Sequence, residues 1–407
     1  MLAAIGAAAA SVALETYIFA DGALAERFRA ALVEAAQRGV RVRVLVDAFG
    51  SLELPDYFWH PLQSAGAEVR VFNPITVGRL GIRDHRKLLA CDGRVAFIGG
   101  FNIAKEYEGD GVTRGWCDLG VRVTGALAAQ LEASFDRLFA LADFRHRPFV
   151  RLRKSGAKRT LVGGAEQLLL SGPGRGASPL SRALRKDLRA AAGSGTGILP
   201  VRWRARSRAG AAENMNPSPD RRDACANAVR MVVAYFLPPW RLRRDLQRVA
   251  RRGGRVQLIL AGKSDVALAQ LAGRSLYQRM LRAGVEIYEY QPQVLHAKLF
   301  IVGGAVYAGS ANLDLRSLKL NYELMARFEN AAVTAQAEEI FEAMLARSRR
   351  IEKKGWKKSR SLWTKWKEQW ANFLLARVDP YLSLRQWRGM PEKRKAKSGK
   401  AETSNIR

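Results

Sequence analysis

The chain repeats one order of hydrophobic and polar segments. Residues 15–19 (Glu-Thr-Tyr-Ile-Phe) form a strand-like run, residues 24–38 carry apolar side chains at helical spacing, and residues 40–46 begin with alternating Val and Arg. Apolar residues three and four apart predict a helix, whereas short β-branched or alternating runs predict strands. The same strand–helix–strand order returns later, at residues 232–237, 242–252 and 255–260. The chain therefore contains one structural unit twice.

Each copy continues with another apolar strand, at residues 65–72 and 283–290. Short strands separated by helices of this length indicate βαβ units and a mostly parallel sheet. We therefore predict an α/β fold of two domains related by internal duplication, at residues 1–150 and 151–345. A chain of 407 residues is long enough for two such cores.

Some segments fall outside the repeat. Residues 193–223 are rich in Gly, Ser, Pro and Arg without an apolar period, which predicts a disordered insertion. Residues 346–407 form a basic tail, and its polar end from residue 391 is also predicted to be disordered. Residues 1–14 are rich in Ala but lack a basic start, so we interpret them as a first helix leading into the first strand. No apolar run reaches the roughly 18 residues that a membrane-spanning helix needs.

The charge is unusual for a globular protein. The chain has 68 Lys and Arg against 37 Asp and Glu, a formal net charge of +31. Such a surface attracts polyanions, which include nucleic acid, an anionic bilayer and phosphorylated substrates. The three cysteines Cys91, Cys117 and Cys225 have no metal-ligand spacing, and their odd number rules out a disulfide framework made from all of them. This cysteine usage favours a reducing, cytosolic setting.

The candidate chemistry lies late in each copy. His85 and Lys87 are two residues apart, and so are His296 and Lys298. On a strand, residues two apart point to the same face. Each pair is followed by small residues and an Asn, at Gly100 and Asn102 in the first copy and at Ser310 and Asn312 in the second. Small residues let a ligand approach the backbone closely.

Two such sets facing each other would suit a phosphate. The lysines and amides would bind its nonbridging oxygens, and the imidazoles would serve covalent attack and proton transfer. The chain has only 4 His, and two of them occupy equivalent positions of the repeat. A single His–Lys pair could belong to a solvated strand or to the core, but the pairing argues against that. His60 and His146 lack such neighbours and are interpreted as structural.

Both motifs resemble the His-x-Lys-x4-Asp signature of the phospholipase D superfamily, with Asp92 completing it in the first copy. The resemblance covers nearly all of residues 10–345 outside the insertion. It is nearest to bacterial cardiolipin synthases, which share the first strand and the Asn-Leu-Asp-x-x-Ser run seen at residues 312–317. The resemblance implies two fused phospholipase D-like α/β/α domains with the active site at their interface.

The resemblance also implies a two-step displacement without a metal or other cofactor. One histidine attacks phosphorus to form a phosphohistidine, and the other protonates the leaving alcohol and deprotonates the incoming one. We assign His85 as nucleophile and His296 as general acid and base, although the sequence does not distinguish the two. A carboxylate orients each histidine, and by position these are Asp118 and Glu323. The alternative is that both are ordinary surface acids.

The second motif departs from the signature, because Gly303 replaces its Asp. We interpret the Asp of the signature, Asp92 in the first copy, as support for the turn and the lysine. Its loss would then weaken the enzyme without abolishing activity. An inactive second copy is the alternative.

The tail interleaves Lys and Arg with Trp residues. Trp363, Trp366 and Trp370 are three and four residues apart and share one helical face. Basic residues and Trp on one helix are typical of binding to an anionic membrane surface. The alternatives are that the Trp side chains pack on the catalytic body or bind nucleic acid.

The resemblance favours phosphatidyl transfer, with cardiolipin and glycerol made from two molecules of phosphatidylglycerol. The expected partners are anionic phospholipid and the membrane surface, at the cytoplasmic face of a bacterial inner membrane, and no obligate protein partner is expected. A nuclease of the same superfamily would suit the charge, but such nucleases often carry one motif per chain. A hydrolase that uses water and a weakened lipid-binding member are further interpretations. The sequence does not fix the acceptor.

Overall fold

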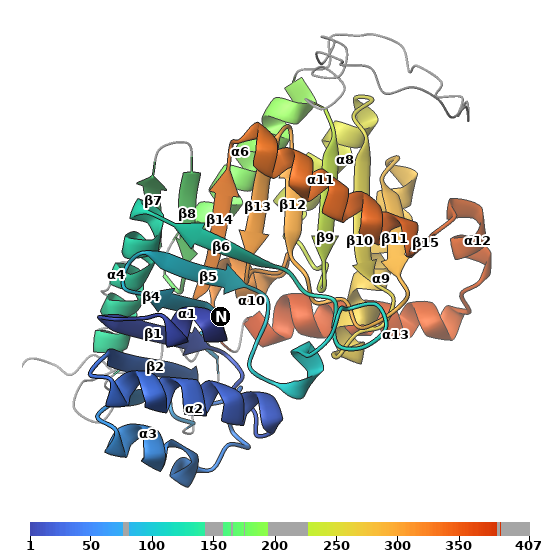
Figure 1. Cartoon of the computed structure of the whole chain (residues 1–407). Coiled ribbons are helices and arrows are strands. Elements are labelled where there is room, and N and C mark those ends of the chain that lie inside the picture. Colours follow the sequence, from blue (N-terminus) through green and yellow to red (C-terminus); the bar gives the residue numbers. More distant parts are fainter. Residues whose placement is uncertain are drawn as a thin grey trace, which may run out of the picture.

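The computed structural model describes residues 1–75, 81–142, 158–163, 166–174, 176–193, 227–380 and 383. The predicted insertion at 193–223, apart from Gly193, lies outside these residues, as do His146, Cys225 and the chain end from residue 391. The first half contains a six-stranded sheet, coloured blue to teal in Figure 1. Its spatial order is β3 (Glu68–Phe72), β2 (Arg41–Asp47), β1 (Ser11–Thr16), β4 (Leu88–Cys91), β5 (Val95–Gly99) and β6 (Gly120–Thr124).

The second half contains a nine-stranded sheet. Its order is β15 (Ser348–Arg350), β11 (Glu286–Tyr290), β10 (Val256–Ala261), β9 (Val229–Val233), β12 (Leu299–Val302), β13 (Ala305–Gly309), β14 (Glu323–Phe328), β8 (Glu166–Ser171) and β7 (Arg159–Gly163). The order β11-β10-β9-β12-β13-β14 repeats the order β3-β2-β1-β4-β5-β6 of the first sheet. The duplication read from the sequence is therefore a duplication of sheet topology.

Both sheets are mixed, so the predicted mostly parallel arrangement is wrong. Only β1, β2 and β3, and likewise β9, β10 and β11, pair in parallel. From β4 and β12 onward every ladder is antiparallel, because tight turns such as residues 92–94 and 303–304 connect neighbouring strands directly. The first strand also begins at Ser11, four residues before the predicted run at 15–19. The second sheet extends past the predicted boundary at residue 345, because β15 pairs with β11.

Helices cover both faces of each sheet. They are α1 (Leu2–Gly6), α2 (Ala23–Gln37), α3 (His60–Ser64) and α4 (Ala126–Leu141) in the first half, and α6 (Pro179–Gly193), α8 (Trp240–Arg251), α9 (Ala267–Arg282), α10 (Leu315–Lys319) and α11 (Ala331–Ala346) in the second. Short 3-10 turns occur at η1 (Asp56–Trp59) and η2 (Lys105–Tyr107). In both copies a glycine in the left-handed region, Gly39 or Gly253, follows the first long helix and turns the chain into the next strand.

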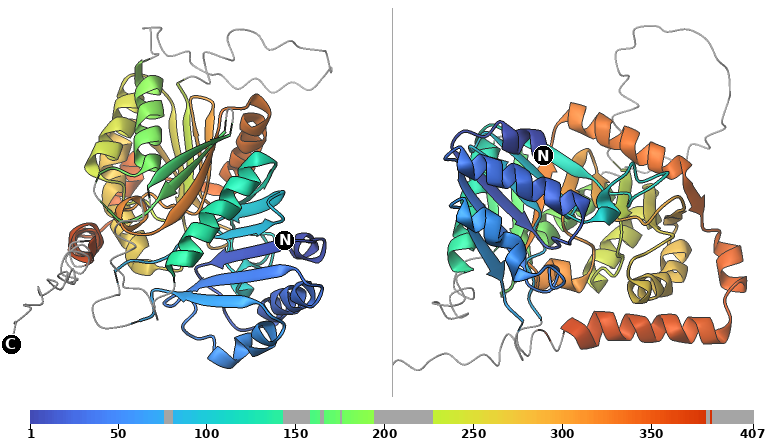
Figure 2. Two further views of the ribbon diagram at one scale, coloured as in Figure 1. Left: turned by 90° about the vertical axis from the view of Figure 1, so that its left-hand side faces the viewer. Right: turned by 60° about the horizontal axis from the view of Figure 1, so that its bottom comes forward.

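Three hydrophobic clusters hold these layers. The central cluster joins residues of both sheets with α4 and α11, as Phe135 and Phe341 illustrate. Two outer clusters pack the first sheet against α1, α2 and α3, and the second sheet against α6, α8 and α9. The views in Figure 2 show the two sheets and their helices packed into one body. Because the central core is shared, the halves present their strand ends to a common interface.

The tail continues from β15 through α12 (Lys353–Lys358) and α13 (Leu362–Phe373) into the π-helical turn η3 (Leu374–Val378). The helix α13 packs against α9, with Ala371 and Glu368 buried beneath it. No helix in the described part of the chain is long and apolar enough to cross a membrane.

Candidate active site

The two His–Lys motifs meet where the halves join. His85 and His296 lie in extended segments just before β4 and β12, and each segment is bridged to a strand entry of the other half. Asp84 pairs with Tyr322, and Leu295 pairs with Cys117. The backbone N–H of His85 donates to the Tyr322 carbonyl at 3.0 Å, and that of His296 donates to the Cys117 carbonyl at 2.8 Å. This exchange of backbone bonds holds both histidines at the interface.

Each half also supplies the carboxylate that bonds the histidine of the other half. Nδ1 of His85 lies 3.1 Å from both carboxylate oxygens of Glu323, which follows Tyr322 in the second half. Nδ1 of His296 lies 2.7 Å from Oδ2 of Asp118, which follows Cys117 in the first half. A carboxylate that accepts from Nδ1–H leaves Nε2 available to a reacting group. Each half therefore orients the histidine of the other.

The lysines lie behind the histidines and are almost fully buried, at 1% exposure for Lys87 and 0% for Lys298. Lys87 donates from Nζ to the His85 carbonyl at 2.9 Å. Lys298 contacts the His296 carbonyl, and its Nζ lies 2.9 Å from Nδ1 of that residue. Two buried ammonium groups are costly unless an anion compensates them, and a phosphate between the histidines would do so.

Burial sets the protonation of the centre. It lowers the pKa of His85 well below the ordinary value, and the charges of Lys87 and Lys298 lower it further. Burial and the Lys298 charge also lower the pKa of His296, against the opposing effect of Asp118. Burial lowers the pKa of Lys87 to about 7 and raises that of Glu323 to about 7. Both imidazoles are therefore expected to be neutral at neutral pH, as a nucleophile requires.

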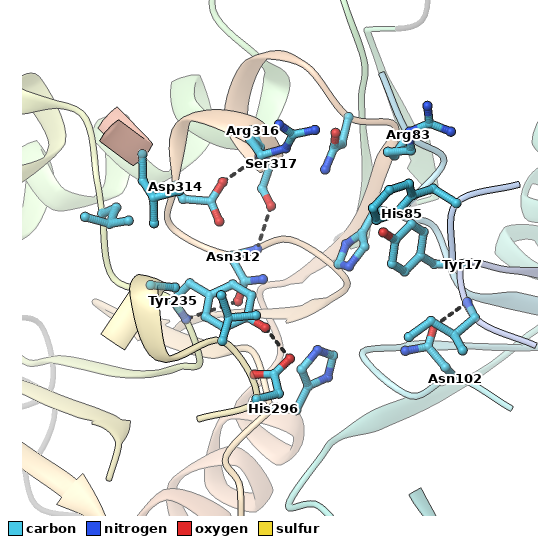
Figure 3. Close-up of a pocket in the computed structure, with 18 of the residues that line it drawn as sticks. Tyr17, Arg83, His85, Asn102, Tyr235, His296, Asn312, Asp314, Arg316 and Ser317 are labelled. Atoms are coloured by element: carbon cyan, nitrogen blue, oxygen red, sulfur yellow. Dashed lines mark hydrogen bonds between the residues drawn. The ribbon is translucent and has the colours of Figure 1, made fainter. Parts of the chain in front are cut away.

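A pocket of about 430 Å³ opens above the histidines. Figure 3 shows His85 and His296 on opposite sides of it, with Asn102 and Asn312 beside them. The Asn102 side-chain carbonyl accepts from the Ile18 N–H at 3.1 Å, and that of Asn312 accepts from the Tyr235 N–H at 3.4 Å. These bonds fix both amides at equivalent places of the two halves. The predicted phosphate ligands Asn102 and Asn312 thus line the pocket.

Ser310 and Gly100, which were also predicted to bind the phosphate, do not line the pocket. Ser310 is fully buried and donates from its hydroxyl to Glu323 at 2.5 Å, and it also accepts from the Leu324 N–H. A side-chain carbon at Gly100 would collide with the carboxylate of Asp118. Both residues therefore position the carboxylates that hold the histidines, and they do not line the pocket. The sequence put them near the site correctly, but it could not distinguish a ligand from a support.

Asp92 also lies away from the pocket. It follows β4, a strand of four residues that spans about 13 Å, and caps its far end. Its carboxylate accepts the N–H groups of Ala9, Ala10 and Ser11 at 2.7–3.0 Å. It makes no contact with Lys87. Asp92, grouped with the catalytic residues as part of the signature, therefore does not line the pocket, and its contacts agree with the interpretation as support for the turn.

The second copy shows what this position requires. Gly303 occupies the same turn, with φ of 55° against 54° at Asp92. Its N–H donates to the Ala228 carbonyl, just as the Asp92 N–H donates to the Ser11 carbonyl. The missing carboxylate therefore changes a turn at the far end of β12 and leaves the surroundings of His296 intact.

Several pocket residues have no signal in the motifs. Tyr17 packs against His85 with ring centroids 5.0 Å apart, and Tyr107 and Trp116 pack against His296 at 5.6 and 5.7 Å. Tyr235 donates to Asp265 at 2.5 Å, and Arg83 and Arg316 also line the pocket. Arg316 lies in α10 and Tyr107 in η2, and the residue types at these positions differ between the two copies, so the repeat did not identify them.

Comparison with known proteins names the family. The family model for the cardiolipin synthase, phospholipase D-like domain matches residues 1–139 and 223–345. The chain belongs to this family. Cardiolipin synthase B of Salmonella typhi is 31% identical over 333 residues, a match that spans 79% of this chain and 71% of the relative. Cardiolipin synthase 1 of Bacillus anthracis is 30% identical over 337 residues, spanning 80% of this chain and 60% of the relative.

The chain thus spans about three fifths of the length of the Bacillus relatives it matches, at 60% and 63%. Among solved structures, phosphatidylserine synthase of Haemophilus influenzae superposes with a TM-score of 0.65 at 13% identity, covering 94% of this chain and 92% of that one. The polyphosphate kinase of Porphyromonas gingivalis superposes with a TM-score of 0.51 at 15% identity, covering 85% of this chain and 47% of that one. These likenesses show the fold alone, and together with the family match they confirm the predicted arrangement of two fused phospholipase D-like halves.

Proposed function

We propose that this chain transfers a phosphatidyl group between phospholipids, and that its reaction converts two molecules of phosphatidylglycerol into cardiolipin and glycerol. The observation that carries the proposal is the pair of histidines, each held at Nδ1 by a carboxylate of the other half and facing one pocket. The relatives that it matches are named cardiolipin synthases, which supports cardiolipin as the product.

In the first step, Nε2 of His85 attacks the phosphorus of the donor. The bond between phosphorus and the glycerol headgroup oxygen breaks, and protonated His296 gives its proton to that oxygen. A bound anionic phosphodiester favours the protonated form of His296, which the Asp118 carboxylate also stabilises. Glycerol leaves, and a phosphatidyl group remains on His85.

In the second step, neutral His296 takes the proton of the acceptor hydroxyl. The acceptor oxygen attacks phosphorus, the bond to His85 breaks, and cardiolipin is released with the enzyme in its starting state. Lys87 and Lys298, buried behind the histidines, stabilise the added negative charge at phosphorus. Asn102 and Asn312 contribute their amide groups from the pocket wall.

The tail supports a membrane surface as the place of reaction. Trp363, Trp366 and Trp370 are 59%, 54% and 50% exposed, so they do not pack on the catalytic body. Their rings stack along α13, with centroids 4.9 and 6.4 Å apart. The turn η3 that follows α13 contributes Leu375 to the pocket. The Trp-bearing helix therefore ends beside the pocket, which supports entry of lipid headgroups from this side.

The exposed apolar residues Phe49 and Val266 also line the pocket, at 53% and 41% exposure. An apolar rim together with the exposed Trp residues of α13 favours lipid over nucleic acid as the substrate. With the net charge of +31, these features support peripheral binding to anionic lipid, which we assign to the cytoplasmic face of the membrane.

The test is incubation of the purified protein with phosphatidylglycerol vesicles in EDTA, followed by lipid mass spectrometry. Cardiolipin and glycerol are expected from the wild type, and neither product is expected from the His85→Ala or His296→Ala proteins. The exposed His60→Ala protein is the matched control. Phosphatidic acid alone would show a hydrolase that uses water. Absence of every product while the protein still binds vesicles would overturn the proposal.

A further inference from the structure

The charged walls of the pocket differ although its catalytic centre is repeated. Arg83 and Arg316 line the end beside His85, as Figure 3 shows. The carboxylate of Asp314 lines the pocket next to Arg316 and accepts from the Ser317 N–H at 2.8 Å. The end beside His296 instead carries Asp265 and Tyr235, joined by a hydrogen bond of 2.5 Å. A site that moved one phosphate between equivalent histidines would not need cations at one end only. The asymmetry indicates a second anionic group on the Arg side.

Arg316 has a displaceable partner. Its Nη1 contacts Oδ1 of Asp379 at 2.5 Å, and its Nη2 donates to the Gly81 carbonyl at 3.3 Å. Asp379 comes from the tail, directly after η3, and lines the pocket. The other oxygen of this carboxylate, Oδ2, is buried and has no hydrogen-bond partner among the described residues. A carboxylate held by only one of its two oxygens is a weak occupant of a cationic site.

Asn321 supplies an uncharged group at the same end. Its side chain is 8% exposed and lines the pocket, and its Oδ1 has no hydrogen-bond partner within the part of the chain that the structure describes. Its backbone N–H donates to the Arg316 carbonyl at 2.9 Å, which ties the two residues together. Arg83 is 3% exposed and held by Asp47 at 3.4 Å, so its charge is fixed in place.

We infer that Arg316, Asn321 and Arg83 form a second phosphate subsite, which Asp379 occupies while the pocket is empty and which selects acceptors that carry a phosphate of their own. The guanidinium of Arg316 can donate two hydrogen bonds to phosphate oxygens once Asp379 is displaced. The Asn321 amide binds a further oxygen of the same group.

This inference rests on the proposed function and adds the choice of acceptor to it. Phosphatidylglycerol presents both a hydroxyl and a phosphodiester, whereas water and glycerol present only hydroxyls. If the subsite binds the phosphate of the acceptor, the phosphatidyl-histidine intermediate reacts with the lipid hydroxyl faster than with water. The polar end with Tyr235 and Asp265 suits the hydroxyl groups of the glycerol headgroup.

The test is a competition between two soluble acceptors that differ only in a phosphate. Phosphatidylglycerol vesicles serve as donor, with equal concentrations of deuterated glycerol and sn-glycerol 3-phosphate. Mass spectrometry gives the ratio of phosphatidylglycerophosphate to deuterated phosphatidylglycerol. Both products come from one intermediate, so the ratio does not depend on how much of a variant is folded.

Wild-type protein is expected to favour glycerol 3-phosphate. Arg316→Gln and Asn321→Ala should lower the product ratio, by about tenfold for the arginine, whereas Asp379→Asn should raise it. Arg244→Gln, on the outer surface of α8, is the matched control and should leave the ratio unchanged. Added inorganic phosphate should lower the wild-type ratio by competing for the subsite.

A ratio that is unchanged in Arg316→Gln and Asp379→Asn would overturn the subsite while leaving the proposed function intact. A wild-type ratio that an excess of inorganic phosphate leaves unchanged would also contradict the subsite, because groups that bind the acceptor phosphate should bind free phosphate. Wild-type protein that makes no transfer product with any acceptor, phosphatidylglycerol included, would overturn the proposed function and the inference with it.

Discussion

At the scale of single residues, the charges of Lys87 and Glu323 are expected to change near neutral pH, since burial also raises the pKa of Glu323 to about 7. The pKa of Lys87 is lowered to about 7 by burial, so the ammonium is present below that pH and lost above it. A bound phosphodiester favours the charged form and raises this pKa again.

We therefore predict that kcat/KM, which reports the free enzyme, passes through a maximum near pH 7, because it rises as Glu323 ionises and falls as Lys87 loses its proton. The fall in kcat, which reports the complex, should begin at higher pH. Initial rates on a short-chain phosphatidylglycerol between pH 5.5 and 9.5 measure both profiles. A kcat/KM that stays constant from pH 6 to 9 would contradict this assignment.

The crossed carboxylates give a second prediction at this scale. Asp118→Asn and Glu323→Gln keep the side-chain shape but remove the charge that stabilises the imidazolium and the Nδ1–H tautomer. We expect kcat to fall by roughly 10²–10⁴ in each variant, by analogy with the orienting acid of catalytic triads. The exposed Glu352→Gln protein serves as control. Losses below about tenfold would show that these carboxylates do not orient the histidines.

The same residues show what sequence reasoning could and could not supply. Asp118 and Glu323 were predicted from their positions after each motif, but the exchange between halves was not, because pairing over 178 and 238 positions leaves no local pattern. Ser310 and Gly100 were misassigned for a related reason. A small residue beside a motif looks the same whether it accommodates a ligand or a carboxylate.

At the scale of elements, the turns after β4 and β12 affect the stability of the fold and lie away from the catalytic residues. The Asp92 carboxylate braces the start of β1 through three backbone N–H groups. Burial alone would raise the pKa of Asp92, but these donors outweigh it and lower the pKa. Its contribution to stability is therefore present at neutral pH and lost as the pH falls through the lowered pKa.

Asp92→Asn should lower the free energy of unfolding by about 1–3 kcal/mol at pH 7, and by less in acid. Its kcat per folded molecule should stay near that of the wild type. The converse Gly303→Asp is expected to fold, because Asp92 already adopts the same φ, and to bring no gain in kcat. Denaturant unfolding and kcat measured on the same samples test both variants. A strong gain in kcat for Gly303→Asp would refute the structural role.

The helix α13 carries another prediction. Replacement of Trp363, Trp366 and Trp370 by Ser should weaken binding to anionic vesicles by at least about tenfold, because three exposed rings are lost from the interface. Rates on a monomeric short-chain substrate should be retained. The control is Val162→Ser, an exposed apolar residue on β7. Vesicle sedimentation that is the same for the triple variant and the wild type would exclude α13 as the docking element.

The elements themselves were largely predictable. The strand–helix–strand repeats appear near their expected residues, since apolar periodicity is a local property. The direction of the later strands was not predictable, because their pairing depends on turns and on the shared core. This is why the predicted mostly parallel sheets are mixed in the structure.

At the scale of the whole molecule, the two halves form one catalytic unit. The histidine, lysine, amide and carboxylate sets are duplicated, but each histidine depends on the opposite half for its orientation. The charges on the pocket walls are not duplicated, and this difference allows one end to serve a phosphate and the other a polyol. The sequence predicted the duplicated part, whereas the asymmetric part depends on single positions, such as Arg316 in α10, at which the two copies carry different residues.

The most direct test of the two-histidine mechanism uses a short-chain phosphodiester with a nitrophenol leaving group, which needs no general acid. The His296→Ala protein is predicted to release a burst of one nitrophenol per molecule and then stop, with a phosphatidyl adduct on His85 in alkaline-quenched peptide mass spectra. The His85→Ala protein should give no burst. A burst only in His85→Ala would reverse the two roles, and the absence of a burst and an adduct in both proteins would contradict covalent catalysis by histidine.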